Sequence, residues 1–260
     1  MKPNYLKVFA AVTVAVLITS ASVRTLHASL ASETDNRIES SAKDSYVFKT
    51  YLKDDSVSIQ SKNGVVTLKG TIKEESHKSL AQETVASLPG VKKVNNQLVY
   101  KGEHQTENSD GWIGIKVKTT ILFHKNLNVF KTEVDVKDGV VTLKGEASSQ
   151  AQKELAGEYA KDVVGVKDVK NDMTVAKNPN NTEQTLGEKI DDASITAQVK
   201  RALLFHRSTG AIKTKVSTNN GVVTLHGIAK NGAEKSLVGK LAEDIKGVTN
   251  VVNDMTIAKK

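Results

Sequence analysis

The chain of 260 residues contains no cysteine, which excludes disulfides, thiolate metal sites, a cysteine nucleophile and a lipid-modified N-terminal cysteine. Aromatic residues make up only 4% of the chain, and proline occurs three times. One tryptophan and three methionines cannot build an aromatic cage or a cofactor pocket. Any core must therefore consist mostly of Val, Leu, Ile and Ala, and it must be stable without covalent cross-links.

Signatures of catalysis are also missing from the sequence. There is no Gly-x-Ser-x-Gly elbow, no His-Glu-x-x-His helix and no Walker loop. No two of the six histidines stand at metal-ligand spacing, and adjacent carboxylates such as Asp54 and Asp55 cannot share one face of a helix or strand. We therefore expect no enzymatic activity, no cofactor and no metal.

The N-terminus has the composition of an export signal. Two lysines precede the apolar run of residues 8–23, and the small residues of HASLAS follow it. This order predicts a cleavable signal peptide over residues 1–31, cut after Ala31 or, as a weaker alternative, after Ala21. An uncleaved membrane anchor is the other interpretation, although the run is shorter than the roughly 20 residues of a spanning helix.

One nine-residue motif occurs three times. KNGVVTLKG spans 62–70, KDGVVTLKG spans 137–145 and NNGVVTLHG spans 219–227. In every copy a phenylalanine precedes the turn glycine by 16 residues, and another glycine follows it by 26 residues. The chain therefore consists of three copies of one unit.

Each unit has the pattern helix, strand, strand, helix, strand. Asn-Gly or Asp-Gly at the head of each motif predicts a type I′ hairpin turn, because that turn needs positive φ at both central residues. The next glycine is expected to close the second strand, and the third to end the second helix in a left-handed cap. The glycines with these structural roles are Gly64, Gly70, Gly90, Gly139, Gly145, Gly165, Gly221, Gly227 and Gly247.

The predicted fold class is α+β, with three tandem small αββαβ domains. In each domain two helices pack on one face of a three-stranded mixed sheet, joined by a right-handed crossover. The expected domains span 38–101, 111–177 and 190–260. Residues 32–37 are expected to be a polar lead-in, and the polar stretches 101–111 and 177–189 are expected to be linkers.

The units resemble a known family in four features: the first-helix phenylalanine, the GVVTLxG hairpin, the second helix and the final GVxxVxNxhxV, where h is apolar. Each unit is similar to a BON domain, named for bacterial OsmY and nodulation proteins. The resemblance covers nearly all of the chain after the leader, with three units where OsmY-like members usually have two. It implies a non-enzymatic, osmotic-stress-associated protein of the Gram-negative periplasm. The family is described as transport-associated and phospholipid-binding, and OsmY-like members as chaperones of exported proteins.

Charge suggests where a membrane could bind. The net charge is +8, and the third unit alone carries +5. Lys200, Arg201 and Arg207 cluster on its first helix, and each basic residue near an anionic bilayer contributes roughly 1 kcal/mol. This predicts weak, peripheral, salt-sensitive binding to anionic phospholipid, while a solvated helix face is the alternative. The charge is too sparse to predict nucleic-acid binding. Trp112, between glycines in GWIG, is a further candidate contact, or else it closes the end of a core.

Two sets of equivalent polar residues have a structural and a functional interpretation. The same strand position is occupied in the three units by Asn96, Asn171 and Asn253. The side-chain amide there either forms hydrogen bonds with nearby backbone groups or contacts a ligand. We favour the hydrogen bonds to the backbone. His124 and His206 occupy one position in two units and are expected on a helix surface.

Two functional hypotheses follow. In the first, the three BON units bind anionic phospholipid at the membrane surface. In the second, they act as a chaperone or scaffold for exported protein clients, because tandem units on linkers increase avidity.

Overall fold

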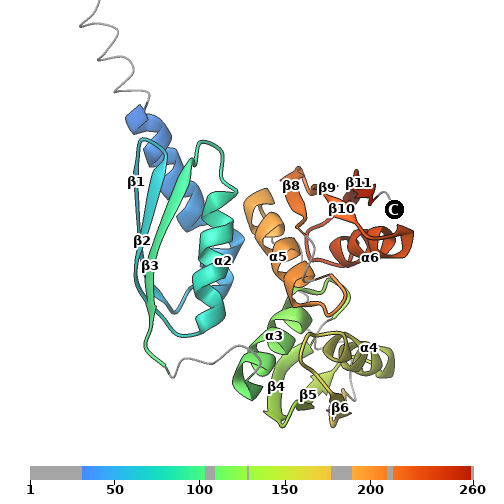
Figure 1. Cartoon of the computed structure of the whole chain (residues 1–260). Helices are drawn as coiled ribbons and strands as arrows, with labels where there is room; N and C mark the ends of the chain where they lie inside the picture. Colours follow the sequence, from blue (N-terminus) through green and yellow to red (C-terminus); the bar gives the residue numbers. More distant parts are fainter. Residues whose placement is uncertain (1–30, 103–108, 128, 177–188, 210–212, 259–260) are drawn as a thin grey trace, which may run out of the picture.

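The computed structural model of the chain describes residues 31–102, 109–127, 129–176, 189–209 and 213–258 (Figure 1). Residues 1–30 of the predicted signal peptide and most of both predicted linkers lie outside this range. Within it, the chain forms three small α+β domains, each with helices packed against a mixed sheet. The predicted fold class is confirmed.

Domain 1 begins earlier than the sequence suggested. Its first helix covers residues 31–44, so the expected polar lead-in at 32–37 is wrong: these residues are helical. The remaining elements are η1 (Val47–Tyr51), β1 (Ser56–Lys62), β2 (Val65–Ile72), α2 (Glu75–Ala86) and β3 (Lys93–Tyr100). Strand β2 pairs antiparallel with β1 and parallel with β3, as expected for a hairpin followed by a helical crossover.

Domains 2 and 3 repeat this order. Domain 2 contains α3 (Asp110–Phe123), β4 (Val129–Lys137), β5 (Val140–Ala147), α4 (Gln150–Lys161), β6 (Asp168–Asn171) and β7 (Thr174–Val175). Domain 3 contains α5 (Asp192–Phe205), β8 (Lys215–Asn219), β9 (Val222–His226), β10 (Ile228–Ala229), α6 (Gly232–Glu243), β11 (Asn250–Asn253) and β12 (Thr256–Ile257). The central strand is again antiparallel to one neighbour and parallel to the other.

The repeated glycines serve backbone geometry, and all nine have positive φ. The turn pairs are type I′ as predicted; Asn63 and Gly64, for example, have φ of 56° and 79°. The second glycine does not close its strand in domains 1 and 2, because β2 continues through Gly70 and β5 through Gly145. A Cβ atom on Gly70 would lie 1.8 Å from the Ser56 carbonyl oxygen, so only glycine fits this close strand contact.

An aspartate holds each hairpin turn from the start of the domain's first helix. In domain 2, the carboxylate of Asp110 accepts the backbone N–H groups of Asp138 (2.7 Å) and Gly139 (2.8 Å). Asp35 and Asp192 hold the other two turns in the same way. Each aspartate therefore ties the first helix of its domain to the hairpin 29 residues later.

The repeated asparagines satisfy local backbone groups, which confirms the structural interpretation. The amide nitrogen of Asn171 donates to the carbonyl of Lys153 on α4 (2.6 Å), while its side-chain oxygen accepts the N–H of Met173 (3.3 Å). Asn96 and Asn253 make equivalent bonds in the other domains. These side chains join the second helix to the third strand and are not free to contact a ligand.

The three domains form two apolar cores. Domains 1 and 3 share one continuous cluster of buried residues, which also takes in Phe123 of domain 2. The rest of domain 2 has a core of its own. Domains 1 and 3 share a core because α5 packs against α2 of domain 1 as well as against its own sheet and α3 of domain 2 (Figure 1).

Removing one turn aspartate should destabilise its domain. We expect Asp110→Ala to lower the free energy of unfolding of domain 2 by roughly 2 kcal/mol, because two turn N–H groups lose charge-assisted hydrogen bonds. Urea unfolding followed by the fluorescence of Trp112 measures this. The matched control is Asp135→Ala, which breaks the exposed ion pair with Lys144 and should cost less than about 1 kcal/mol. Equal effects of the two variants would show that the turn bonds are unimportant.

Candidate functional site

Lys200 and Arg201 of the predicted basic cluster lie on α5 where it meets domain 1. Arg207 follows the end of α5 at Phe205 and is exposed, so the prediction that it lies on the first helix is wrong. Lys200 Nζ pairs with Glu83 Oε2 of α2 at 2.8 Å, with both side chains about one-third exposed. The N-terminus of α5 is also bound to domain 1, since Asp191 Oδ2 accepts the N–H of Tyr46 and Ser194 Oγ accepts that of Val47. The N-terminus of α5 is therefore bound to domain 1 by two hydrogen bonds.

Arg201 is buried, with 6% of its surface exposed. Its guanidinium carbon lies 4.2 Å from the centre of the Phe205 ring, one turn along α5. Its Nη2 atom has no hydrogen-bond partner among the described residues. Burial lowers the pKa of Arg201 to about 10, and the nearby charge of Glu83 opposes that effect. The side chain still carries its charge at neutral pH.

Arg207 and Trp112 lie at the junction of domains 2 and 3. The backbone N–H of Arg207 donates to the Asp162 carbonyl (2.9 Å), and its side chain reaches the Val166 carbonyl (3.4 Å). Trp112 lies in the first turn of α3 and meets the Phe205 ring edge to face, with centroids 6.3 Å apart. The tryptophan is half-buried at this contact.

The junction of domains 2 and 3 has an approximate two-fold arrangement. Residues after α3 pair with residues after α6, with Lys125 N–H donating to Asp244 and Lys246 N–H donating to Phe123. Residues after α5 pair in the same way with residues after α4. Both domains therefore use the same two segments to bind each other.

His124 and His206 occupy equivalent places in this junction, so the expectation that they lie on a helix surface is wrong. His124 is 3% exposed, its ring packs on Tyr159, and its Nε2 lies 3.7 Å from Asp244 of domain 3. His206 Nε2 lies 3.9 Å from Asp162 of domain 2. Each Nδ1 accepts the N–H of the residue two positions later, so the neutral ring carries its proton on Nε2, facing the carboxylate.

Burial keeps both imidazoles neutral. It lowers the pKa of His124 to about 4, although the charge of Asp244 acts in the opposite direction. Burial also lowers the pKa of His206, against the effect of Asp162. Protonation at Nδ1 would in addition remove the hydrogen bond that each ring accepts.

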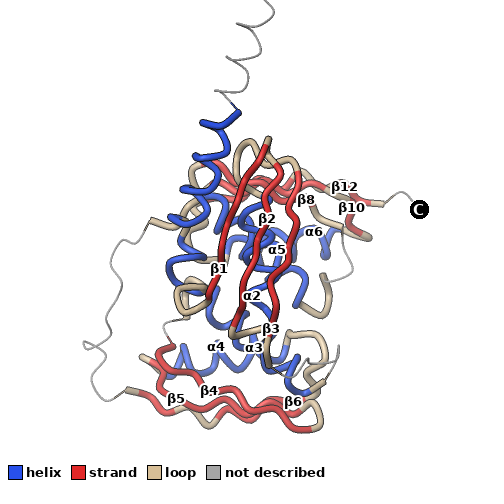
Figure 2. Tube along the Cα trace, turned by 90° about the vertical axis from the view of Figure 1, so that its left-hand side faces the viewer, coloured by secondary structure: helices blue, strands red, loops and turns tan. Residues whose placement is uncertain are grey.

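A different surface is both basic and open. On domain 1, the helices cover one face of the sheet, and Figure 2 looks onto β1, β2 and β3 from the opposite side. The three strands contain no Asp or Glu, and their three lysines, Lys62, Lys69 and Lys93, are all exposed. Lys62 and Lys93 flank Val65 in one row of the sheet. We call this surface the lysine face.

The corresponding faces of the other domains differ. In domain 2, the strands combine lysines with carboxylates such as Glu133 and Asp135, and in domain 3 they contain only Lys215 as a basic residue besides His226. The lysine face is therefore the sheet surface with a clear positive charge. Sequence reasoning missed it because the lysines lie on separate strands and come together only in the folded sheet.

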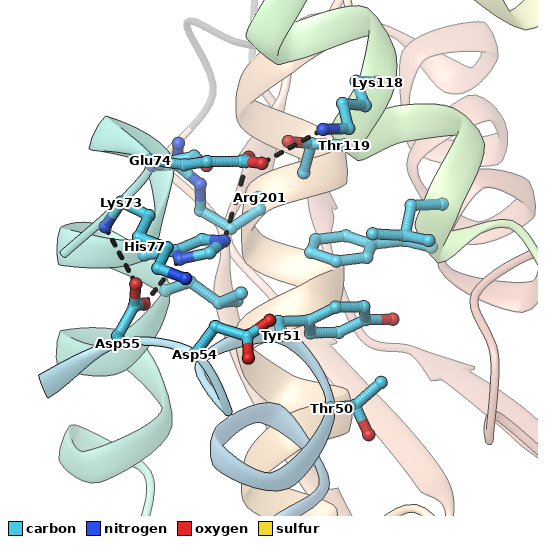
Figure 3. Close-up of a pocket in the computed structure, with 14 residues that line it drawn as sticks. Thr50, Tyr51, Asp54, Asp55, Lys73, Glu74, His77, Lys118, Thr119 and Arg201 are labelled. Carbon is cyan, nitrogen blue, oxygen red and sulfur yellow. Dashed lines mark hydrogen bonds and ion pairs between the residues drawn. The ribbon is translucent and has the colours of Figure 1, made fainter. Parts of the chain in front are cut away.

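A cleft of about 330 Å³ opens where the three domains meet (Figure 3). Most of its charged groups are paired with each other: Glu74 contacts Lys118 of α3 at 3.0 Å, and Asp55 Oδ2 lies 2.6 Å from His77 Nδ1. Arg201 reaches it from α5. Across the described residues, no group of carboxylates and histidines could hold a metal ion, and no helix has the length and apolarity of a membrane span.

A comparison with models of protein families identifies the family of this chain. The BON domain model matches residues 34–102, 109–177 and 191–259, most of the chain. The chain belongs to the BON domain family. This BON protein is 32% identical over 146 residues to the osmotically-inducible protein Y of Escherichia coli (strain K12), an alignment that covers 56% of this chain and 71% of the relative.

Two further likenesses are weaker guides to function. An uncharacterized protein of Anaplasma centrale is 31% identical over 145 residues, 55% of this BON protein and 91% of the relative. A solved structure of CdsD, a structural protein of the type III secretion system of Chlamydia trachomatis, is also similar. The alignment covers 82% of this chain and 90% of the CdsD chain, at 18% identity. Its TM-score of 0.24 is too low to support any conclusion.

The histidines should make the junction of domains 2 and 3 sensitive to pH. The folded pKa values lie below the ordinary value of 6.5, so the neutral rings contribute stability that is present above that pH and lost as the pH falls toward the folded values. For His124 the loss by pH 5 is roughly 2 kcal/mol. Urea unfolding followed by Trp112 fluorescence, from pH 8 to pH 5, measures it.

The variant His124→Phe/His206→Phe should lose most of this pH dependence, because the junction of domains 2 and 3 then has no imidazole to be protonated. His226→Phe is the matched control, since that side chain is exposed and should leave the slope unchanged. A wild-type stability that is constant across this range would contradict the assignment.

Proposed function

We propose that this BON protein is a non-enzymatic protein of the periplasm that binds anionic phospholipid surfaces through the lysine face. The supporting observation is the open sheet of domain 1, with Lys62, Lys69 and Lys93 exposed and no carboxylate in its three strands. None of these lysines has an ion-pair partner among the described residues. Their charges are thus available to an external anionic surface.

The shape and the strength of this face suit a reversible membrane contact. The three lysines project from one face of the sheet, so they can approach phosphate groups of one surface together. At roughly 1 kcal/mol for each basic residue, the face contributes about 3 kcal/mol, enough for weak association that salt screens. Val99 on the same face is 56% exposed and adds apolar area beside the charges.

The interdomain packing supports this surface over the basic cluster of α5. Lys200 is paired with Glu83, and Arg201 is buried. Arg201 could reach a bilayer only if domain 1 separated from α5, and Lys200 only by leaving Glu83, whereas the lysine face needs no rearrangement. The relative named for osmotic induction supports a role in envelope stress as part of this proposal.

Reversing the charge of the lysine face should abolish membrane binding. We expect residues 32–260 to float with vesicles of phosphatidylglycerol at low salt, and neither at high salt nor with phosphatidylcholine vesicles. The variant Lys62→Glu/Lys69→Glu/Lys93→Glu should remain unbound, because the face then repels anionic headgroups.

The matched control is Lys137→Glu/Lys144→Glu/Lys170→Glu, which makes the same change of charge on the sheet of domain 2. It should retain binding. Equal loss in both variants would show that net charge alone attracts the membrane. If the wild type floats with no vesicle but binds unfolded exported proteins, the chaperone or scaffold function is favoured and the lipid proposal fails.

A further inference from the structure

Arg201 is a buried charge that packs on the Phe205 ring but has no hydrogen-bonded anion among the described residues. No hydrogen bond or ion pair to its guanidinium is present among the described residues, although only 6% of the side chain is exposed. A buried cation without a partner is strongly destabilising, so such groups are normally paired or ligand-bound. The equivalent residues of the other domains, four positions before the first-helix phenylalanine, are Thr119 and Asp44. The arginine is therefore a feature of domain 3 alone.

The carboxylates around Arg201 are engaged elsewhere. Glu83 pairs with Lys200, and Glu74 pairs with Lys118. Asp55 accepts the backbone N–H of Lys73 and contacts His77. Asp54 lines the cleft but is exposed to solvent and makes no hydrogen bond or ion pair with the arginine. The domain interface thus leaves the guanidinium without an anion, on the wall of an open cleft.

Part of the lining of the cleft is apolar. Tyr51 and Phe123 lie side by side with ring centroids 5.3 Å apart, and Leu80 and Leu122 complete this wall. Leu122 is 41% exposed, which is high for a large apolar side chain facing a cavity. A cation and an apolar wall in one cleft together fit a ligand that has an anionic end and a hydrocarbon part.

We propose that the three-domain cleft binds a small amphipathic oxyanion, a carboxylate or phosphate monoester with a short apolar chain, whose oxygen atoms accept hydrogen bonds from Arg201. A planar guanidinium can donate two parallel bonds to such a group, which gives it both affinity and orientation. The volume of about 330 Å³ lies at the small end of the range for ligand pockets.

This site is separate from the lysine face. The cleft is lined by η1, α2, α3 and α5, on the helical side of domain 1, whereas the lysine face is on the opposite side of the sheet (Figures 2 and 3). The bound anion would contact residues of all three domains at once. It would therefore stabilise the interdomain packing as well as neutralise Arg201.

Calorimetric titration of the whole protein with octanoate, octyl phosphate and inorganic phosphate tests the proposal. Octanoate or octyl phosphate should bind saturably and raise the melting temperature, and inorganic phosphate should bind at least tenfold more weakly because it lacks the apolar part. If all three bind equally, the apolar wall has no role and the site is a simple anion site. No saturable binding of any of the three would overturn the proposal.

Arg201→Met separates a ligand site from a structural role. This variant should lose at least tenfold in affinity for octyl phosphate. It should melt at or above the wild-type temperature without ligand, because an apolar side chain replaces a buried unpaired charge. Lys215→Met is the control; it removes an exposed cation of the same domain that does not line the cleft, and should keep the affinity. Unchanged affinity in Arg201→Met, or a lowered melting temperature with the affinity retained, would overturn the assignment.

A second variant keeps the test valid if Arg201→Met does not fold. Leu122→Asp places a negative charge on the exposed apolar wall without altering a buried residue. It should leave the melting temperature of the free protein nearly unchanged and weaken octyl phosphate binding at least tenfold. Wild-type affinity in this variant would contradict binding in the cleft.

Discussion

Burial of helix α5 around most of its circumference is the constraint on which the rest of the structure depends. Its own sheet covers one side, α2 of domain 1 covers another, and α3 of domain 2 lies near its C-terminal end. Three polar residues of α5 are buried in these contacts: Ser194 against Val47 of domain 1, Thr196 against Thr218 of its own sheet, and Gln198. Domains 1 and 3 therefore share one core, and neither has an independent surface at this contact.

This packing turns the helices inward and leaves the sheets outside. The three sheets began as copies of one pattern, yet their open faces now differ: three lysines without a carboxylate in domain 1, mixed charges in domain 2 and one lysine in domain 3. The inner helical surfaces have diverged as well, because only domain 3 has an arginine where the others have Thr119 and Asp44. The three domains therefore share one fold but present different side chains on their outer and inner surfaces.

The repeated motif predicted the fold well because its signals are local. An Asn-Gly pair dictates its turn through backbone φ alone, and the alternation of the strands depends on nearest neighbours. Asp35, Asp110 and Asp192 each stand 29 residues before a turn glycine, but this spacing alone does not show that the carboxylate reaches the turn, because the bond forms only when the first helix packs beside the hairpin. The prediction that the second strand ends at Gly70 was wrong, because a glycine can lie within a strand where another backbone comes close.

Interdomain contacts could not be predicted in the same way. In the sequence, Lys200 and Arg201 look like residues of a solvent-exposed helix face. Only the packing of α2 against α5 shows that Lys200 is paired with Glu83 and that Arg201 is buried. His124 and His206 looked exposed for the same reason, because their partners, Asp244 and Asp162, come from another domain. The lysine face depends on strand pairing across 31 residues of sequence, from Lys62 to Lys93, which charge counts along the chain do not reveal.

The central claim is that the three domains form one body around α5. Small-angle X-ray scattering of residues 32–260 in dilute solution tests it most directly. Three domains packed as described should give a radius of gyration of about 18 Å, near the value for a single compact chain of this length. Three domains joined only by their polar linkers would give roughly 25 Å or more, and that result would contradict the account.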